Sequence, residues 1–316
     1  MATLPFSSYQ LHKHPLVQEA DIINLHWVGE ILDYPSFFEH CNKPIVWTLH
    51  DMNPFQGVFH YKNDEIVNAH IRPDFDAKMK LIKRTAINKI KKGAIITPSK
   101  WLLTEAINSD FFSFFIKECI PNSIDFDVFK PQDQNALRKQ YSIANDEFVM
   151  LFVADSINSY RKGFDILIEA IAHLGTITIT VLVIGKTEIP IVSGIKMIYL
   201  GEITTANEMA NCYALSDVFV LPSREDNLPN VMLEAFACGT PLIGFPVGGI
   251  AEHTILNHTG VLADEMNSMS LAKVIRFFYE NKAKYKRGGI RKYAEDNFGL
   301  KKQAVEYYKV YKKLLI

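Results

Sequence analysis

The stretch Val218-Phe-Val-Leu-Pro-Ser-Arg-Glu-Asp226-Asn-Leu-Pro-Asn-Val-Met-Leu-Glu234-Ala-Phe-Ala-Cys-Gly239 decides the fold of this chain. The apolar run over 218–221 predicts a buried strand, and the loop after it opens a short helix that Gly239 ends. Asp226 lies on the loop, whereas Glu234 lies inside the helix among apolar residues. Burying a carboxylate there costs free energy unless a partner hydrogen-bonds it. The stretch therefore predicts a strand, a ligand-binding loop and a helix.

Similar apolar runs alternate with helical patterns along the rest of the chain. This alternation predicts βαβ units and parallel sheets, because parallel strands need helical crossovers between them. The predicted fold class is α/β, with two Rossmann-like domains. The strands are expected at 22–28, 45–50, 94–98, 118–120, 149–154, 177–184, 196–200, 218–221, 241–245 and 260–262.

The polar, proline-bearing stretch at 130–135 predicts the boundary between the two domains. The first domain is expected over 1–134, joined by an amphipathic C-terminal helix over 300–316, and the second over 135–299. Thirteen of the 16 glycines follow residue 140. The second half therefore has the turns of a complete doubly wound domain, and we expect a piece to be missing from the first.

Composition narrows the class of protein. The chain has 316 residues, of which 48% are hydrophobic and 22% charged, as in a folded globular protein. A net charge of -1 and the lack of a recognition motif argue against nucleic acid as a partner. The four cysteines show neither a metal spacing nor a disulfide framework, so we expect a reducing cytoplasm. The first residues do not resemble a signal peptide, and no run is apolar enough to span a membrane.

Residues 78–92 form a local charge run with seven basic residues and no acidic one. Met79, Ile82, Ala86 and Ile90 recur within it at helical spacing. One interpretation is peripheral contact with the anionic inner face of a membrane. The other, to which we give equal weight, is a solvated helix whose apolar stripe packs on the sheet.

The start of the helix after Asp226 suits an anionic ligand. The free N–H groups of a first helical turn and the helix dipole attract phosphate. Asn230 is the expected N-cap, and the amides around Asn230 and Val231 are expected to face a ligand phosphate. Asp226 can accept hydrogen bonds from sugar hydroxyls, and Glu234 can accept them from a ribose diol.

These residues resemble the E-x7-E signature of group 1 (family 4) glycosyltransferases, which have the GT-B fold. Arg161-Lys162-Gly163 resembles the lysine-glycine segment of that family. Further boxes follow in the same order as in the family, and the resemblance runs from about Asp21 onward. They are Ile45 to Met52, Pro121 to Pro131, Val183 to Gly185, Leu200 to Glu202 and Pro246 to Glu252.

The resemblance implies a role for each site residue. Asp226 would contact the transferred sugar, Glu234 would hold the nucleotide ribose, and Lys162 would balance the diphosphate charge. Phosphate would also be met by Arg161, Asn230 and Val231. His50, at the end of a first-domain strand, would face the sugar across a cleft between the domains. The alternative for His50 is that it only satisfies a backbone group at the strand end.

The implied activity is retaining glycosyl transfer without a metal or other cofactor. The donor would be a nucleotide-sugar and the acceptor a glycan or a lipid-linked group, most simply in surface polysaccharide biosynthesis. Asp74-Phe-Asp76 and Asp125-Phe-Asp127 match a D-x-D metal motif, but such short matches arise by chance. We therefore predict no metal site.

Three departures from the family pattern leave alternatives open. Asp226 replaces the usual glutamate, and the neighbouring Glu225 could compensate or be exposed. Arg161 is the one arginine near the position where the family has a phosphate-binding arginine. Nothing before Asp21 resembles the family's glycine-rich loop. A catalytically silent, truncated protein that binds nucleotide or supports a partner is the second hypothesis, and a GT-B-fold epimerase is a less favoured third.

Overall fold

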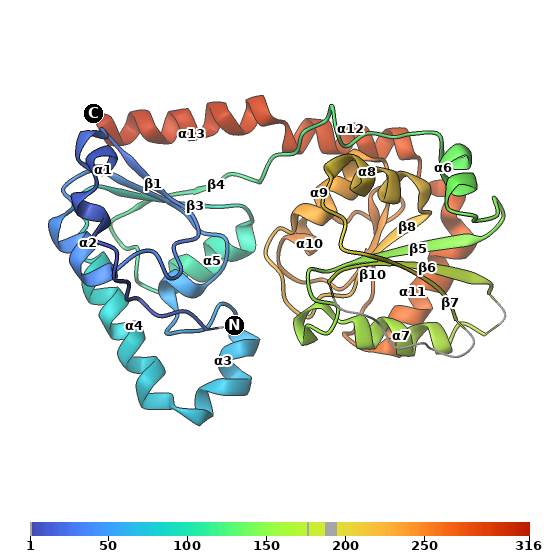
Figure 1. The fold of residues 1–316 in the computed structure, drawn as a ribbon, viewed down its shortest axis with the longest axis horizontal. Coiled ribbons are helices and arrows are strands. Elements are labelled where there is room, and N and C mark those ends of the chain that lie inside the picture. Colours follow the sequence, from blue (N-terminus) through green and yellow to red (C-terminus); the bar gives the residue numbers. More distant parts are fainter. Residues whose placement is uncertain (1, 176, 187–194) are drawn as a thin grey trace. The chain divides into compact units, whose positions relative to one another are not determined.

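The chain folds into two compact units in a computed structural model that describes residues 2–175, 177–186 and 195–316 (Figure 1). Unit 1 comprises residues 1–121 and 303–316, and unit 2 comprises residues 122–302. Each unit contains a parallel sheet with helices on its faces, so the α/β prediction is confirmed. All ten expected strands are present, with ends that differ from the predicted ones by a few residues.

Unit 1 is built on a four-stranded parallel sheet in the order β1-β2-β3-β4. Strands that follow one another in sequence lie side by side, and helices connect them as parallel pairing requires. The strands are β1 (Ile23–Leu25), β2 (Ile45–Thr48), β3 (Gly93–Thr97) and β4 (Ile116–Cys119). Its helices are α1 (Pro15–Glu19), α2 (Tyr34–His40), α3 (Lys62–Asn68), α4 (Pro73–Ile87) and α5 (Lys100–Asn108), with 3-10 turns η1 (Leu11–Lys13), η2 (Asn53–Phe55) and η3 (Ala69–Ile71).

The two faces of this sheet are covered by segments far apart in sequence. On one face, Phe37 and Phe38 of α2 pack with Trp47 of β2. On the other, Val310 and Leu314 of α13 (Leu300–Leu315) pack on Val46, Ala94 and Ile96 (Figure 1). Two tyrosines of α13 also reach polar groups of the sheet: Tyr311 Oη accepts from Asn24 Nδ2 at 2.8 Å, and Tyr307 Oη lies 3.0 Å from Thr48 Oγ1.

Unit 2 is built on a six-stranded parallel sheet in the order β10-β9-β8-β5-β6-β7. The strands are β5 (Phe148–Val153), β6 (Ile179–Ile184), β7 (Lys196–Gly201), β8 (Val218–Leu221), β9 (Leu242–Gly244) and β10 (Gly260–Leu262). The chain builds outward from β5 to β7 and then returns to the other side of β5 with β8. The strand order therefore reverses between β5 and β8, and the crevice outside such a switch point is where open α/β sheets bind ligands.

Helices cover both faces of the second sheet. They are α6 (Gln134–Gln140), α7 (Phe164–Ala172), α8 (Ala206–Leu215), α9 (Asn230–Ala237), α10 (Gly248–His253), α11 (Ser268–Asn281) and α12 (Arg287–Phe298). α7 packs on α11, whereas α9 packs on α8 and α12. Side-chain caps start three of them: Asp133 accepts from the Asn135 and Ala136 amides, Thr205 from the Glu208 amide and Asn267 from the Ser270 amide.

The segment 122–134 belongs to unit 2, although the sequence places the boundary after it. The Ile124 amide donates to the Phe298 carbonyl at 3.0 Å. Arg291 of α12 donates to the carbonyls of Phe126 and Phe129. A partly buried guanidinium that binds the backbone of a distant loop gives no local sequence signal, so the boundary predicted from the proline at 131 lies too far along the chain.

The basic run at 78–92 is not one uniformly solvated helix. α4 ends at Ile87, and Lys83 within it is fully buried. The Lys83 ammonium donates to the Asn53 carbonyl at 2.7 Å and to Asn53 Oδ1 at 3.1 Å. Burial lowers the pKa of Lys83 to about 7. Met79 and Ala86 are also buried, so the apolar stripe of α4 packs into unit 1. Within the described ranges, no helix combines the length and the apolar character needed to cross a bilayer.

Candidate active site

The candidate site forms where the chain leaves the two strands that flank the switch point of unit 2. After β5 the chain makes a 3-10 turn, η4 (Tyr160–Lys162), and enters α7 at Gly163. After β8 it makes the loop 222–229 and enters α9. Gly163 has a left-handed φ of 71°, and a Cβ there would lie 2.0 Å from the Pro222 carbonyl oxygen. Glycine therefore lets the turn and the loop touch by their backbones.

The carboxylate of Asp226 is the centre of this contact. Its Oδ2 accepts from Lys162 Nζ at 2.7 Å and from Ser223 Oγ at 3.1 Å. Its Oδ1 lies 3.2 Å from Arg161 Nη1. The Asp226 side chain is only 8% exposed. Two cations and one anion thus converge at the carboxyl ends of β5 and β8.

The protonation states follow from these contacts. Burial alone would raise the pKa of the Asp226 carboxyl, but Lys162 and Arg161 outweigh it and hold the pKa below its usual value. Burial lowers the pKa of the Lys162 ammonium, and Asp226 opposes that shift. We conclude that the site holds an ionised carboxylate against a protonated lysine, because a neutral lysine would leave the buried anion short of its nearest partner.

A second set of contacts clamps the turn to the loop. The Arg224 amide donates to the Arg161 carbonyl at 2.8 Å, and Arg161 Nη1 donates to the Glu225 carbonyl at 2.9 Å. The Arg224 side chain forks onto the carboxylate of Asp165 in α7, and its guanidinium carbon lies 3.8 Å from the Tyr160 ring centroid. Planar, bidentate pairing fixes direction as well as distance. Arg224 therefore helps to hold Arg161 and Lys162 beside Asp226.

Glu234 lies one turn inside α9, and its side chain is hydrogen-bonded to a tyrosine. Tyr213 Oη donates to Glu234 Oε2 at 2.8 Å. Burial raises the pKa of the Glu234 carboxyl, and the Tyr213 hydrogen bond opposes the rise. Glu225 is also buried, which rules out the interpretation that it is exposed beside Asp226.

The start of α9 differs from the sequence expectation. Pro229, not Asn230, occupies the N-cap position, and it gives no side-chain cap. Asn230 is the first helical residue, and its Oδ1 accepts from Asn122 Nδ2 at 3.0 Å. The side-chain amide of Asn230 is thus engaged by Asn122, a residue distant in sequence, and spacing along the chain cannot predict such a contact. The amides of Asn230 and Val231 still belong to the first turn, whose N–H groups have no intrahelical acceptor.

The start of α10 lies against the backbone of Asp226 and Asn227. Gly248 has a φ of 48°, and a Cβ there would lie 1.9 Å from the Asp226 carbonyl oxygen. The Gly249 amide donates to the Asn227 carbonyl at 2.6 Å. The two adjacent glycines thus let a third loop approach the backbone that carries Asp226.

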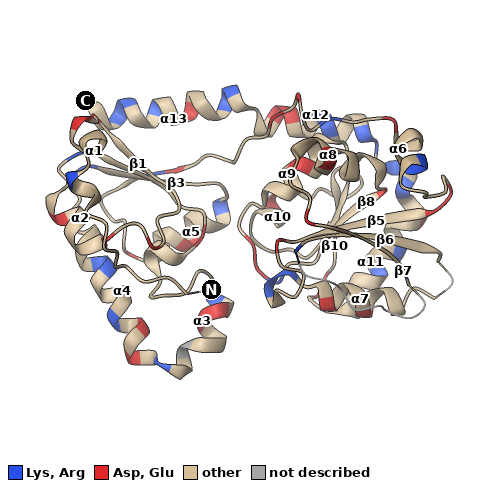
Figure 2. Cartoon of the chain, viewed as in Figure 1, with Lys and Arg blue, Asp and Glu red and all other residues tan. Residues whose placement is uncertain are grey.

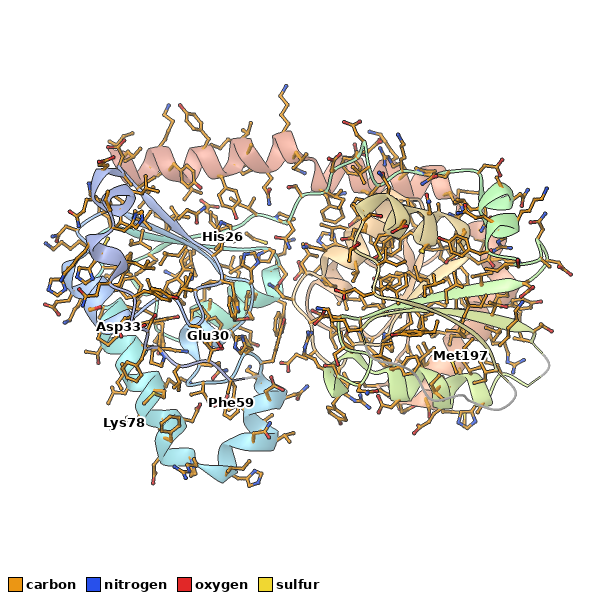
Figure 3. All side chains as sticks on the ribbon, viewed as in Figure 1. His26, Glu30, Asp33, Phe59, Lys78 and Met197 are labelled. Carbon is orange, nitrogen blue, oxygen red and sulfur yellow. The ribbon has the colours of Figure 1, made fainter. Side chains whose placement is uncertain are left out.

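His50 lies in unit 1, just beyond the end of β2. Its Nε2 lies 3.0 Å from Nδ1 of His26, which follows β1 (Figure 3). Burial, and then the neighbouring His26, lower the pKa of His50, whereas Asp51 opposes the shift. His50 therefore has a side-chain partner, and its role toward a sugar stays a prediction.

Sequence reasoning did not identify four residues that contact the predicted site residues or hold them in place. They are His26, Tyr213, Ser223 and Arg224. His26 lies within the strand expected at 22–28, which the structure ends at Leu25, and this strand pairs with the one that ends near His50, so strand adjacency could have indicated it. Ser223 and Arg224 lie on the loop that carries Asp226. Nothing in the sequence marked Tyr213, because a tyrosine in an apolar helix is normally interpreted as a core residue.

Residues 147–281 match the family model described as "Glycosyl transferases group 1". The chain is 29% identical over 283 residues to the D-inositol 3-phosphate glycosyltransferase of an Arthrobacter species, covering 83% of this chain and 63% of that protein. It thus spans less than two thirds of that relative.

Two solved structures share the fold. Sucrose-phosphate synthase from Thermosynechococcus elongatus superimposes with a TM-score of 0.75 at 20% identity, covering 93% of this chain and 73% of that one. The Anabaena protein HepE in complex with UDP gives 0.72 at 20% identity, covering 95% and 81%. The GT-B type of fold is thereby confirmed.

Proposed function

We propose that this chain, whose residues 147–281 belong to the group 1 glycosyl transferases, moves a sugar from a nucleotide-sugar to a glycan or lipid-linked acceptor. The reaction is proposed to retain the anomeric configuration and to use no metal, in surface polysaccharide biosynthesis. The observation that carries the proposal is the convergence of Lys162, Arg161 and Asp226 at the switch point of unit 2. HepE, which shares the fold, was solved in complexes with UDP and with UDP-glucose.

The donor is proposed to bind along the line from Asp226 to Glu234. A lysine ammonium has three donors, and Asp226 takes one from Lys162, so Lys162 can bind a phosphate oxygen without leaving Asp226. That arrangement places the carboxylate beside the sugar attached to the same phosphate. Asp226 then accepts from sugar hydroxyls, the first turn of α9 at Asn230 and Val231 meets the diphosphate, and Glu234 accepts from the ribose.

The chemistry follows from where charge develops. As the sugar–phosphate bond breaks, negative charge grows on the departing diphosphate and positive charge on the sugar ring. Lys162 and Arg161 stabilise the first, and the carboxylate of Asp226 stabilises the second. Both cations are held in place before the donor arrives, so little reorganisation accompanies bond cleavage. His50 is proposed to contribute to the sugar site from unit 1.

A nucleotide-sugar screen tests the proposal. Uridine and guanosine diphosphate sugars are expected to raise the melting temperature by different amounts, according to their affinities. A ligand present at a hundredfold its Kd adds about 2.7 kcal/mol to the free energy of unfolding. Glu234→Ala is expected to abolish most of the shift, whereas Lys292→Ala, at a residue whose side chain is 69% exposed on α12, leaves it unchanged. Turnover of the stabilising donor is then measured with and without acceptors.

The outcomes separate the hypotheses. Stabilisation with transfer or donor hydrolysis supports the transferase. Stabilisation without any turnover supports the silent nucleotide-binding alternative, and isomerisation of the donor alone supports the epimerase. If no nucleotide-sugar stabilises the chain, the donor site is wrongly assigned.

We also propose that unit 1 contacts the anionic, cytoplasmic face of a membrane, where a lipid-linked acceptor would be found. The supporting observation is that exposed apolar residues accompany the basic run at 78–92. Ile66, Val67 and Ile71 of the α3–η3 region are exposed by 56–74%, and Leu81 of α4 by 64%. Exposed basic residues, among them Arg72, Lys78 and Arg84, lie along α4 and just before it (Figures 2 and 3). Apolar and basic side chains together are typical of helices that lie in a membrane interface.

Vesicle co-sedimentation tests this contact. The chain is expected to bind vesicles that contain phosphatidylglycerol, to bind neutral phosphatidylcholine vesicles far less, and to be released by salt. Ile66→Ser combined with Ile71→Ser is expected to weaken binding by roughly a hundredfold, because each inserted side chain contributes about 1.5 kcal/mol or more. Leu16→Ser, at a residue of unit 1 that is 71% exposed, is the matched control. Equal losses for both variants would contradict the assigned surface.

A further inference from the structure

Tyr213 is a fully buried residue of α8 whose hydroxyl contacts a site residue. Its ring packs edge-on against Phe129 and Phe219. Its hydroxyl donates to Glu234 Oε2 at 2.8 Å, and its backbone carbonyl accepts from Thr240 Oγ1 at 2.7 Å. The ring cannot move without opening the core, so the hydroxyl is held at a fixed position in unit 2.

This contact restricts what Glu234 can do. A buried hydroxyl without an acceptor is unfavourable, so the carboxylate is held in the rotamer that keeps Oε2 on Tyr213. The proton of Tyr213 occupies one acceptor site of Oε2. The other lone pair of Oε2 and both of Oε1 stay able to accept from a ligand. The Glu234 carboxylate is therefore held in one orientation, and both of its oxygens can still accept a hydrogen bond from a ligand.

We propose that Tyr213 is a positioning residue that makes the nucleotide site selective for a ribose with both of its hydroxyls. Two adjacent hydroxyls can donate to the two carboxylate oxygens, whereas a ribose lacking them would leave Tyr213 as the donor to Oε2 and add none from the ligand. The proposal rests on the proposed function, because it takes the ligand of Glu234 to be a nucleoside diphosphate.

The contact also sets a pH dependence. Burial raises the pKa of Glu234, and the Tyr213 hydrogen bond lowers it. Titratable groups of the same cluster include Cys212 of α8, Cys238 at the C-cap of α9 and, beyond that thiol, Arg287 and Arg291 of α12. Ribose binding needs the carboxylate, so affinity is complete above the pKa of Glu234 and is lost as pH falls through it. Removing the Tyr213 hydroxyl raises that pKa further, so the loss begins at a higher pH.

Calorimetry with Tyr213→Phe tests the proposal, since phenylalanine keeps the ring and the core. Affinities for UDP and GDP are compared with those for their 2′,3′-dideoxy counterparts, from pH 5 to 8, in the wild type, Tyr213→Phe and Glu234→Gln. The preference of Tyr213→Phe for the ribose form is expected to fall roughly three- to tenfold, the effect of losing one hydrogen bond of ordinary strength. Its pH midpoint is expected to rise. Tyr279→Phe, at a partly exposed tyrosine of α11, is expected to match the wild type.

Three other outcomes would each contradict either the role of Tyr213 or the proposed function. An equal loss of affinity for ribose and dideoxy nucleotides, with an unchanged pH midpoint, means that Tyr213 only supports the fold and overturns the inference. If the wild type binds UDP or GDP but Glu234→Gln keeps the ribose preference, the inference fails while the proposed function stands. If the wild type binds neither nucleotide, the proposed function fails and the inference with it.

Discussion

Replacing Lys162 by methionine is expected to lower kcat/KM for sugar transfer by roughly a hundred- to a thousandfold. Removing one fixed donor from a site of developing negative charge has effects of that order. Methionine keeps most of the side-chain volume but removes the donor that lies 2.7 Å from Asp226 Oδ2. The Asp226 carboxylate keeps Arg161 and Ser223, so unfolding is expected to become easier by about 2–4 kcal/mol, less than for a fully orphaned buried charge.

The double variant Lys162→Met with Asp226→Asn separates folding from catalysis. Removing both charges is expected to restore much of the stability, measured by urea unfolding, while transfer stays lost. Activity of Lys162→Met within tenfold of the wild type at saturating donor would contradict the assigned role. Since the folded pKa of Asp226 is depressed, its stabilising contribution is present above the usual pKa of an aspartate and is lost as pH falls through the lower folded value. Asp226→Asn is expected to remove this acid-sensitive part.

Gly163→Ala is expected to destabilise unit 2 by about 3 kcal/mol or more. The substitution combines a left-handed φ of 71° with a Cβ placed 2.0 Å from the Pro222 carbonyl oxygen. Because neither partner of the clash is a flexible side chain, the turn at 160–162 must move away from the loop at 222–226. Transfer is therefore expected to fall as well, since the movement separates Lys162 from Asp226.

Gly201→Ala is the matched control for this prediction. Gly201 has a similar φ of 69°, but a Cβ there meets nothing within 4 Å. Only the backbone strain of about 1–2 kcal/mol is expected, with activity retained. Equal losses of unfolding free energy in the two variants would mean that the contact between Gly163 and Pro222 does not matter.

The strands of both sheets could be predicted because their signal is local. Apolar runs such as Val218–Leu221 are buried on both faces, and turn residues bound them. The domain boundary could not be placed as well, because Arg291 and Phe298 tie residues 124–129 to unit 2 across more than 160 positions of sequence. The buried Lys83 was missed for a related reason: its partner, Asn53, lies in the short 3-10 turn η2, whose position in the fold no sequence periodicity indicates.

The site residues also differ in whether the sequence around them predicts their position. Asp226, Lys162 and Arg161 could be named from sequence, because each lies beside a strand end or a glycine whose place in the fold is predictable. Asn230 as a cap was wrong, since Asn122 engages it and Pro229 takes the cap position. Tyr213 became visible only through its hydroxyl contact with Glu234.

The helix that covers one face of the first sheet has a consequence for how the protein is made. Val310 and Leu314 complete a core with Val46, Ala94 and Ile96, yet the ribosome adds them only after all of unit 2 has been translated. Unit 2 is one continuous segment and can fold as soon as it emerges, whereas unit 1 begins first and is sealed last. Throughout that interval one apolar face of the nascent sheet is uncovered, and the time spent synthesising the second unit sets how long a chaperone would have to shield it.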